Sequence, residues 1–278
     1  MKNLQEFGFK TDHKTYIIAE VGINHGGNLD VAKKLIDSAS NTGCDAVKFQ
    51  TYKTELRAPR GNQKVFDILK KCELRFSDFE ILQRHARDRG LHFFSTPFDN
   101  ESVDYLESIN TDLYKVASFD VVNKNLLRRI AKTTKPVIMS VGMSNREEIE
   151  EAYEILSQHI NLSLLHCVSA YPTSEEDANL NAITTLKTAF PDAVIGQSDH
   201  TNGIRVPLFA VAAGAQIIEK HFRLEDDVDC VDAAVSVDEN QLKEFVHSVR
   251  DLEKIMGKSL LNRREVEANS LIFRRPSL

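Results

Sequence analysis

Two histidines stand about twenty residues apart, each at or near the end of a short apolar run. His200 closes the run at 193–200, AVIGQSDH, and His221 is the penultimate residue of the run at 215–222, AQIIEKHF. Two imidazoles at neighbouring strand ends, completed by a carboxylate and water, are suited to bind a divalent metal ion. We therefore expect both to be metal ligands. Other histidines lie outside this pattern and are expected at the surface: His13, His85, His92, His159 and His247.

A second set of residues combines positive charge with orientable hydroxyl donors. Lys48 and Lys115 supply point charges, which suit a phosphate or a phosphorylated carboxylate. The hydroxyls come from Thr96, Ser118, Ser140 and Ser198. The alternative is that the two buried lysines only pair with a glutamate. Three carboxylates, Glu20, Asp120 and Asp232, remain for proton transfer, metal binding or hydroxyl recognition.

These side chains lie at or just beyond the ends of eight β-rich apolar runs. The runs cover residues 15–22, 45–52, 92–98, 113–118, 136–142, 162–171, 193–200 and 215–222, and stretches of helical period separate them. Eight such units with short connections predict a closed (β/α)8 TIM barrel. The GINHGG stretch at 22–27 does not match a dinucleotide-binding turn, which disfavours an open doubly wound sheet. In a barrel the active site lies at the C-terminal ends of the strands.

The remaining segments are expected to surround one barrel domain that spans residues 1–278. Residues 1–14 form an N-terminal extension that we expect at the opposite mouth, and residues 258–278 form a C-terminal tail. Residues 53–76 form the longest segment outside the barrel pattern, on the active-site face, and are a candidate lid.

Composition restricts the classes of partner. The net charge of −6 argues against nucleic acid and anionic membrane, because both require a basic face. Four cysteines lie far apart without a C-x-x-C pair, which is typical of reduced thiols in a cytoplasmic protein. No stretch has the length of a membrane span. A metal, a phosphate-binding corner and several carboxylates then fit three chemistries: condensation of a phosphorylated enol with a carbonyl compound, a metal-dependent aldolase, or a phosphosugar isomerase.

A series of motifs carries a resemblance that distinguishes among these chemistries. In chain order they are IIAEVGINHGG, DAVKFQTYK, STPFD, YKVASFD, SVGMS, LHCVSAYPT, GQSDHT and IIEKHF. Together, over about residues 15–275, they resemble the sialic acid (N-acetylneuraminate) synthase family of phosphoenolpyruvate-dependent barrel enzymes. The YKVASFD stretch is more similar to the pseudaminic and legionaminic acid synthase branches.

The resemblance implies a role for each candidate residue. His200 and His221 would bind manganese or magnesium, and phosphoenolpyruvate, the co-substrate, would lie against Lys48, Thr96, Lys115, Ser118, Ser140 and Ser198. An open-chain amino sugar such as N-acetylmannosamine would contact Asp120, Tyr171 and Asp232. The catalytic set would be Glu20, Lys48, Lys115 and His221. The product would be a nine-carbon 2-keto-3-deoxy sugar acid plus phosphate. The alternatives are the same condensation on another aldose or a phosphosugar, and a non-catalytic sugar-binding barrel.

Two departures from the family pattern bear on the substrate and the assembly. Around Asp232 the family reads GPDH, whereas residues 230–233 read CVDA, so we expect the sugar specificity, or the activity itself, to differ. The family also continues into a small antifreeze-like domain, whereas this sequence stops at NSLIFRRPSL. The expectation is a truncation, a separate lid protein or a lid-free enzyme, as well as a homodimer. For a phosphosugar, Arg57, Arg60 and Lys64 could add positive charge, although a solvated loop face is favoured.

Overall fold

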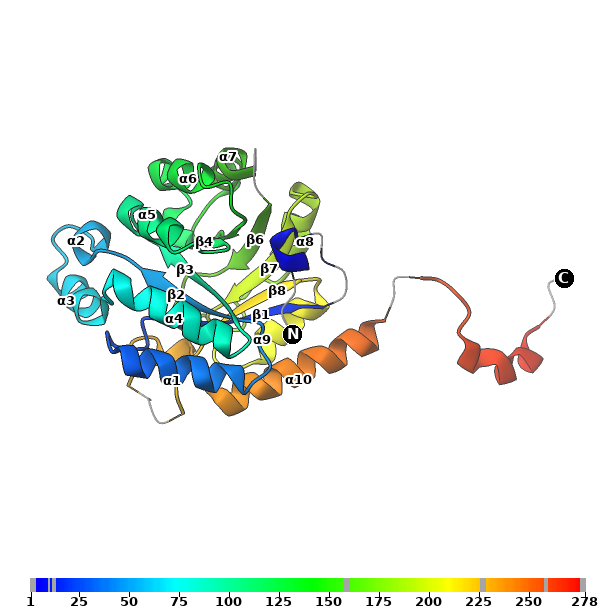
Figure 1. Ribbon diagram of the computed structural model, residues 1–278. Helices are drawn as coiled ribbons and strands as arrows, with labels where there is room; N and C mark the ends of the chain where they lie inside the picture. Colours follow the sequence, from blue (N-terminus) through cyan, green and yellow to red (C-terminus); the bar gives the residue numbers. More distant parts are fainter. Residues whose placement is uncertain are drawn as a thin grey trace.

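A closed barrel of eight parallel strands in chain order forms the centre of the molecule (Figure 1). The computed structural model describes residues 4–9, 11, 14–157, 161–225, 229–257 and 260–275. The strands are β1 (Tyr16–Gly22), β2 (Ala46–Thr51), β3 (His92–Pro97), β4 (Tyr114–Val116), β5 (Val137–Ser140), β6 (Leu162–Cys167), β7 (Val194–Asp199) and β8 (Ile217–His221). Each falls within one of the eight predicted runs. The predicted (β/α)8 TIM barrel is confirmed.

Helices cover the outside of the barrel and follow the strands. They are α1 (Leu29–Ser40), α4 (Phe76–Asp88), α5 (Asn100–Ser108), α6 (Lys124–Ala131), α7 (Arg146–Ser157), α8 (Asn181–Ala189), α9 (Arg205–Ala212) and α10 (Glu239–Met256). The first of them begins because Asn28 accepts hydrogen bonds from the free N–H groups of Asp30 and Val31. Its apolar face is buried against the barrel, as the helical period predicts.

Side chains on alternate strand positions fill the barrel in two layers. The lower layer is apolar and includes Ile18, Phe94, Leu165 and Ile217. Leu4, from the segment before β1, packs into the same cluster, together with Phe9. The described part of the N-terminal extension therefore packs against the N-terminal end of the barrel. Because this end is packed mainly with apolar side chains, a cavity lined by many polar groups can form only toward the C-terminal ends of the strands.

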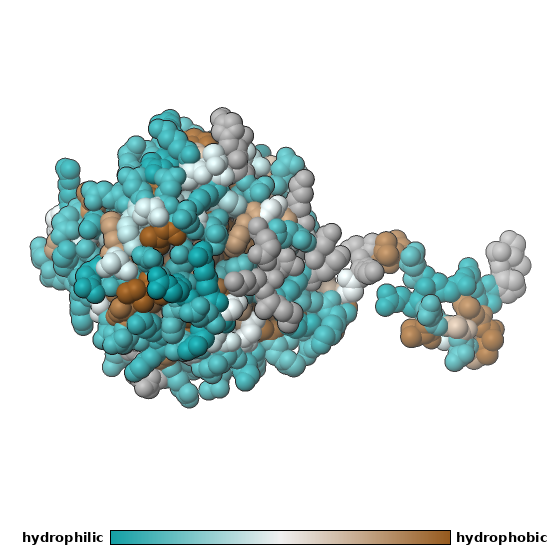
Figure 2. Space-filling model, in the orientation of Figure 1, coloured by the Kyte–Doolittle hydropathy of each residue, from teal (hydrophilic) through white to brown (hydrophobic). Residues whose placement is uncertain are grey.

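The segment between β2 and α4 is helical. It contains α2 (Thr54–Arg57) and α3 (Gln63–Cys72), and Tyr52, Leu69 and Cys72 belong to a small buried cluster beneath it. Short 3-10 segments also occur at Gln5–Phe7, Ser118–Asp120, Ala233–Val235 and Glu265–Phe273. Residues 260–275 extend away from the barrel (Figure 1), and Figure 2 shows hydrophobic side chains along this segment. Leu261 and Phe273 are exposed there. Within the described ranges, no helix has the length and apolar character needed to span a bilayer.

One histidine predicted at the surface is buried instead. His92 begins β3, and its Nδ1 lies 2.7 Å from the hydroxyl of Tyr16. The period-2 pattern of β3 points it toward the covered mouth, where Phe7 also stacks on its ring. His85 is half-buried against Asp37 and His247 is exposed, while residues 13 and 159 lie outside the described residues.

Candidate active site

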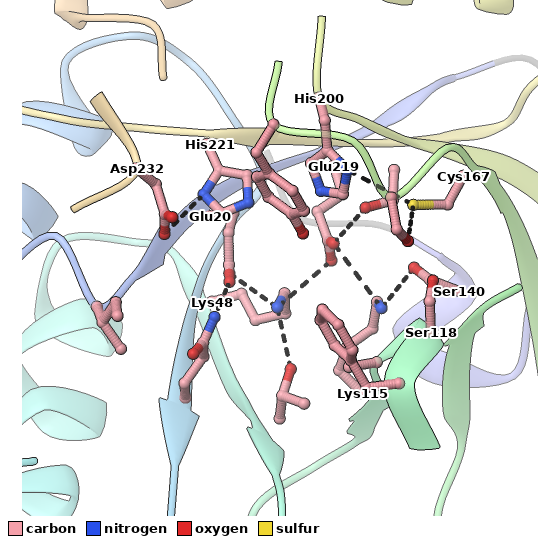
Figure 3. Close-up of a pocket in the computed structure, with 18 of the residues that line it drawn as sticks. Glu20, Lys48, Lys115, Ser118, Ser140, Cys167, His200, Glu219, His221 and Asp232 are labelled. Atoms are coloured by element: carbon pink, nitrogen blue, oxygen red, sulfur yellow. Dashed lines mark hydrogen bonds and ion pairs between the residues drawn. The ribbon is translucent and has the colours of Figure 1, made fainter. Parts of the chain in front are cut away.

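A polar cavity of about 250 Å³ lies at the C-terminal ends of the strands (Figure 3). Its lining includes eleven of the twelve candidate residues: Glu20, Lys48, Thr96, Lys115, Ser118, Ser140, Tyr171, Ser198, His200, His221 and Asp232. The twelfth, Asp120, is buried in the 3-10 turn after β4 and accepts a hydrogen bond from Asn123 Nδ2 at 2.9 Å. The structure therefore collects the predicted residues at one place and sets the Asp120 side chain just outside the lining.

Strand alternation decides which polar strand-end residues enter the cavity. Lys220 and Asp199 point outward, and their Nζ and Oδ2 atoms form a buried ion pair at 2.7 Å. His166 also points outward, and its Nε2 lies 2.7 Å from the carbonyl oxygen of Ala178. These outward residues connect neighbouring strands to each other and to the loops outside the barrel. Asp199 is thereby occupied with Lys220 and with the hydroxyl of Thr201.

Four charged side chains form the floor of the cavity (Figure 3). Lys48 Nζ lies 2.8 Å from Glu20 Oε2 and 3.7 Å from Glu219 Oε2, and Lys115 Nζ lies 3.8 Å from Glu219 Oε1. All four are at most 5% exposed. Parallel pairing brings them together, because Glu20 stands opposite Lys48 across β1 and β2. The cluster contains two positive and two negative groups, so it is close to neutral when all are ionised.

Burial and mutual attraction set the pKa values of these four groups. Burial raises the pKa of Glu20 from 4.5 to about 7, with Glu219 adding to the rise and Lys48 opposing it. For Glu219, burial is outweighed by Lys115 and Lys48, which hold its pKa below the ordinary value. For Lys48, burial is outweighed by Glu20 and Glu219, which raise its pKa. Burial prevails at Lys115 and lowers its pKa. Glu20 is therefore the group of this cluster suited to exchange a proton near neutral pH.

Hydroxyl groups surround the two lysines and form a corner with several donors. Lys48 Nζ donates to Thr96 Oγ1 at 3.0 Å, and Lys115 Nζ donates to Ser140 Oγ at 2.6 Å. Ser118 Oγ accepts a hydrogen bond from the Gly142 N–H at 2.9 Å. A Cβ at Gly142 would lie 3.0 Å from this oxygen and 2.5 Å from Ser169 Oγ, so only glycine allows the approach. This corner can hold an anion with both charge and directional hydrogen bonds.

The two histidines lie at the opposite side of the cavity, beside Tyr171. Their ring centroids are 5.3 Å apart, and the ring of Tyr171 lies 4.1 Å from that of His200. His200 Nδ1 lies 3.0 Å from the Val168 carbonyl oxygen, which fixes the ring and leaves Nε2 toward the cavity. Nδ1 of His221 is buried and makes no hydrogen bond with any residue in the described ranges, and Asp232 Oδ2 lies 3.5 Å from it.

These nitrogens have the chemistry of metal ligands. Burial and nearby cations lower the pKa of His221 well below its ordinary value, so its imidazole is neutral, as a metal ligand must be. Burial would lower the pKa of His200 as well, but Cys167 and the Val168 carbonyl raise it above the ordinary value. Among the described side chains, no three of the His, Cys, Asp and Glu type already converge on one point. The two imidazoles fit a divalent ion, with the remaining positions left to Asp232, water or substrate.

The loop that carries Asp232 reaches the cavity without the glycine–proline turn of the family. Asn24 holds this loop in place with long-range hydrogen bonds. Its Oδ1 accepts from the Asp232 N–H at 3.0 Å, and its Nδ2 donates to the Phe222 carbonyl and to Ser236 Oγ. Burial raises the pKa of Asp232. The carboxyl therefore lies beside His221 despite the altered sequence around it.

Four cavity residues were not assigned a role from the sequence, or were assigned the wrong one. Glu219 joins the two lysines, Gln50 Nε2 donates to Glu20 Oε1 at 3.2 Å, and Cys167 Sγ lies 3.7 Å from His200 Nδ1. Each stands on an inward position of β2, β6 or β8, so strict alternation from the assigned neighbours would have found them. Arg57, favoured as part of a solvated loop, lines the cavity instead.

The sequence also matches the family model described as NeuB, over residues 35–260. The chain belongs to the NeuB family. It is 38% identical to N,N'-diacetyllegionaminic acid synthase of Campylobacter jejuni, over 95% of this chain and 84% of that protein. It is 34% identical to human N-acetylneuraminate-9-phosphate synthase, over 88% of this chain and 72% of that protein.

A solved structure agrees with this assignment. The crystal structure of N-acetylneuraminic acid (sialic acid) synthetase from Leptospira borgpetersenii, in complex with citrate, superimposes with a TM-score of 0.91. It is 37% identical and aligns with 94% of this chain and 91% of that one. The predicted family and enzyme class are confirmed: the NeuB relatives are sugar-acid synthases.

Proposed function

We propose that this protein condenses phosphoenolpyruvate with the aldehyde of an open-chain N-acylated amino sugar, giving a nine-carbon 2-keto-3-deoxy sugar acid and phosphate. One observation carries the proposal. Two buried lysines with hydroxyl partners share a single cavity with two metal-type histidines and a carboxyl whose pKa is about 7. That set matches the chemistry expected of the NeuB relatives, which are named for sialic-type sugar acids.

The phosphate and carboxylate of phosphoenolpyruvate would occupy the corner of Lys48 and Lys115. Ser118, Ser140, Thr96 and Ser198 would orient these oxygens, and the positive side chains would stabilise phosphate as it accepts the bonding electron pair. Ser198 already donates to Glu219 at 2.8 Å, so its hydroxyl would turn toward the ligand on binding. The neutral cluster would then become negative, which favours protonation of Glu20.

The bonds change in two stages. C3 of the enol attacks the sugar aldehyde carbon, forming the new C–C bond, and the aldehyde oxygen takes up a proton to become a hydroxyl. Water adds at C2 and gives up one proton. The tetrahedral intermediate then breaks the C2–O bond to phosphate, and the C2 hydroxyl gives its proton to the departing phosphate and becomes the 2-keto group. Glu20 lies beside Lys48 and can accept or donate a proton near neutral pH. It would either protonate the aldehyde oxygen or accept the proton that water gives up.

His200 and His221 would hold a divalent manganese or magnesium ion, which supplies Lewis-acid polarisation of the aldehyde oxygen when bound. The side chains of Tyr171 and Asp232 flank the same histidines and would orient the sugar. The side chain of Asp120 lies outside the cavity lining, so Asp120 would contribute to sugar binding through the 3-10 turn Ser118–Asp120 that carries it.

A phosphorylated sugar is the second candidate substrate, because the human relative is named for a 9-phosphate product. Of the three basic residues proposed for it, Arg60 and Lys64 are exposed and do not belong to the cavity lining. The structure therefore favours an unphosphorylated sugar.

A panel of aldoses tests the proposal. Protein supplied with phosphoenolpyruvate and manganese is incubated with N-acetylmannosamine, related N-acylated hexosamines and their phosphate esters, and products are identified by mass spectrometry. We expect a product with the mass of phosphoenolpyruvate plus sugar plus water minus phosphoric acid, formed from an unphosphorylated sugar. The Lys115→Met variant is the matched control and should form none. Binding of phosphoenolpyruvate without turnover of any sugar would instead support a non-catalytic barrel.

A further inference from the structure

Arg57 is the last residue of α2, and its guanidinium lies at the edge of the cavity. The group lies over two aromatic rings, with Cζ 3.8 Å from the centroid of Phe98 and 4.4 Å from that of Tyr52. Because the two rings stand at 81° to each other, the guanidinium can lie parallel to only one of them, and the two contacts together limit the directions in which its N–H groups can point.

The Nη1 atom of Arg57 is buried and donates no hydrogen bond to any residue that the structure describes. Glu20, Asp120 and Asp232 attract the guanidinium electrostatically, but the described carboxylates form no ion pair with it. A buried N–H donor of a charged group without an acceptor is unfavourable. An acceptor that arrives with a ligand would remove this cost.

Hydrogen bonds at the start of α2 keep Arg57 in this position. Thr54 donates twice to Glu73 Oε2, from its backbone N–H at 3.0 Å and from its hydroxyl at 2.6 Å. The Lys53 N–H donates to Asp99 Oδ2 at 2.9 Å. The short helix is thus fastened to α3 and to the start of α5, so Arg57 faces the cavity as part of an ordered structure.

The charges around Arg57 indicate which kind of acceptor it would meet. The lysine pair lies on the cavity floor and is already suited to the anion of phosphoenolpyruvate. Around Arg57, by contrast, the carboxyls of Asp232 and Asp120 stand beside a single guanidinium, which disfavours a second dianionic phosphate. A hydroxyl or acyl carbonyl oxygen brings no net charge and still accepts a strong hydrogen bond from a guanidinium.

We propose that Arg57 is a substrate-specificity residue that donates Nη1–H to an uncharged oxygen of the sugar, a hydroxyl or the N-acyl carbonyl. The inference rests on the proposed condensation and assigns its sugar subsite to the rim between α2 and the loop that carries Asp232. The buried donor is then satisfied when the sugar is bound.

Steady-state kinetics of Arg57→Met and Arg57→Lys test the assignment. In Arg57→Met we expect kcat/KM for the sugar to fall by about 10- to 100-fold, as for loss of a hydrogen bond from a charged donor. The Kd of phosphoenolpyruvate, measured without sugar, should change by less than about 3-fold because the lysine corner is intact. Arg57→Lys keeps the charge over Tyr52 and Phe98 but loses the planar donor, and should lie between wild type and Arg57→Met.

Arg60→Met is the matched control, since it removes an exposed arginine of the same segment, and it should leave both constants unchanged. An unchanged sugar KM and kcat in Arg57→Met overturns the inference, as does an equal loss in the Kd of phosphoenolpyruvate. A loss confined to a phosphorylated sugar also overturns it, because the acceptor would then be a phosphate. If Arg57→Met does not fold, Arg57→Lys alone tests the inference. Wild-type kcat/KM for the sugar in Arg57→Lys would then contradict it. If wild-type protein condenses no sugar, the proposed function fails first and this inference falls with it.

Discussion

The charge cluster on the cavity floor allows a quantitative test through Lys115 and Glu219. Lys115→Met removes the cation with little change in length, and Glu219→Gln removes the anion while keeping an oxygen that can accept from Ser198. Both side chains are buried, at 2% and 5% exposure, so solvent screening is weak. If each group stabilises the other in its charged form, the two substitutions must be strongly non-additive.

The magnitude follows from the geometry. Lys115 Nζ and Glu219 Oε1 are 3.8 Å apart. At an effective dielectric constant of about 20, Coulomb's law gives an attraction of about 4 kcal/mol at that distance, as an upper bound. Glu219→Gln leaves Lys115 without a carboxylate partner and should cost about 3–5 kcal/mol. Lys115→Met should cost about 2–3 kcal/mol, because Lys48 still neutralises Glu219.

Urea unfolding of wild type, both single variants and the double variant measures the coupling. We expect the double variant to lose about 2–4 kcal/mol less than the sum of the single losses. Costs that add to within about 0.5 kcal/mol would refute the reasoning, because the two groups would then be independent. As a control, Lys124→Met with Glu151→Gln should show a coupling below about 1 kcal/mol, since that ion pair is half exposed at the surface.

Two further predictions concern single residues. Because the pKa of Glu20 is about 7 in the folded protein and 4.5 ordinarily, its ionisation lowers the wild-type free energy of unfolding as pH rises through that window. Glu20→Gln, measured by urea unfolding, should therefore gain about 2–3 kcal/mol relative to wild type between about pH 5 and pH 8; a difference independent of pH would contradict the shift. Gly142→Ala places a Cβ 3.0 Å from Ser118 Oγ and should weaken phosphoenolpyruvate binding, measured by calorimetry, by about 10-fold or more. Gly8→Ala at the opposite mouth is its control, and an equal affinity in both would argue against Ser118 as a phosphate ligand.

Much of the fold could be predicted from the sequence because one pattern repeats. Eight apolar runs separated by helical periods leave few topologies other than a barrel, and a barrel collects strand ends at one mouth. Residues such as Lys48, Ser198 and His221 were therefore found from position alone. Position at a strand end is not sufficient, however, because alternation sends Lys220 and His166 to the outside, where partners on other elements satisfy them.

The remaining differences depend on contacts between distant segments. Arg57 looks like a charged loop residue in sequence, and only the rings of Tyr52 and Phe98 turn it into the cavity. The position of Asp232 depends on Asn24, more than two hundred residues earlier in the chain. His92 is buried because the N-terminal segment closes the mouth above it. Most of these contacts join residues that are far apart in the sequence. Secondary-structure propensity and hydrophobic periodicity are local properties, so they could not indicate them.

Phosphate release from phosphoenolpyruvate tests the central claim most directly. Metal-stripped protein is supplied with N-acetylmannosamine, or with the sugar selected from the panel, and release is followed with and without manganese. The account predicts release only when sugar and metal are both present, and none from Lys115→Met. Release at the same rate without sugar, or no release from any sugar despite bound phosphoenolpyruvate, would contradict it.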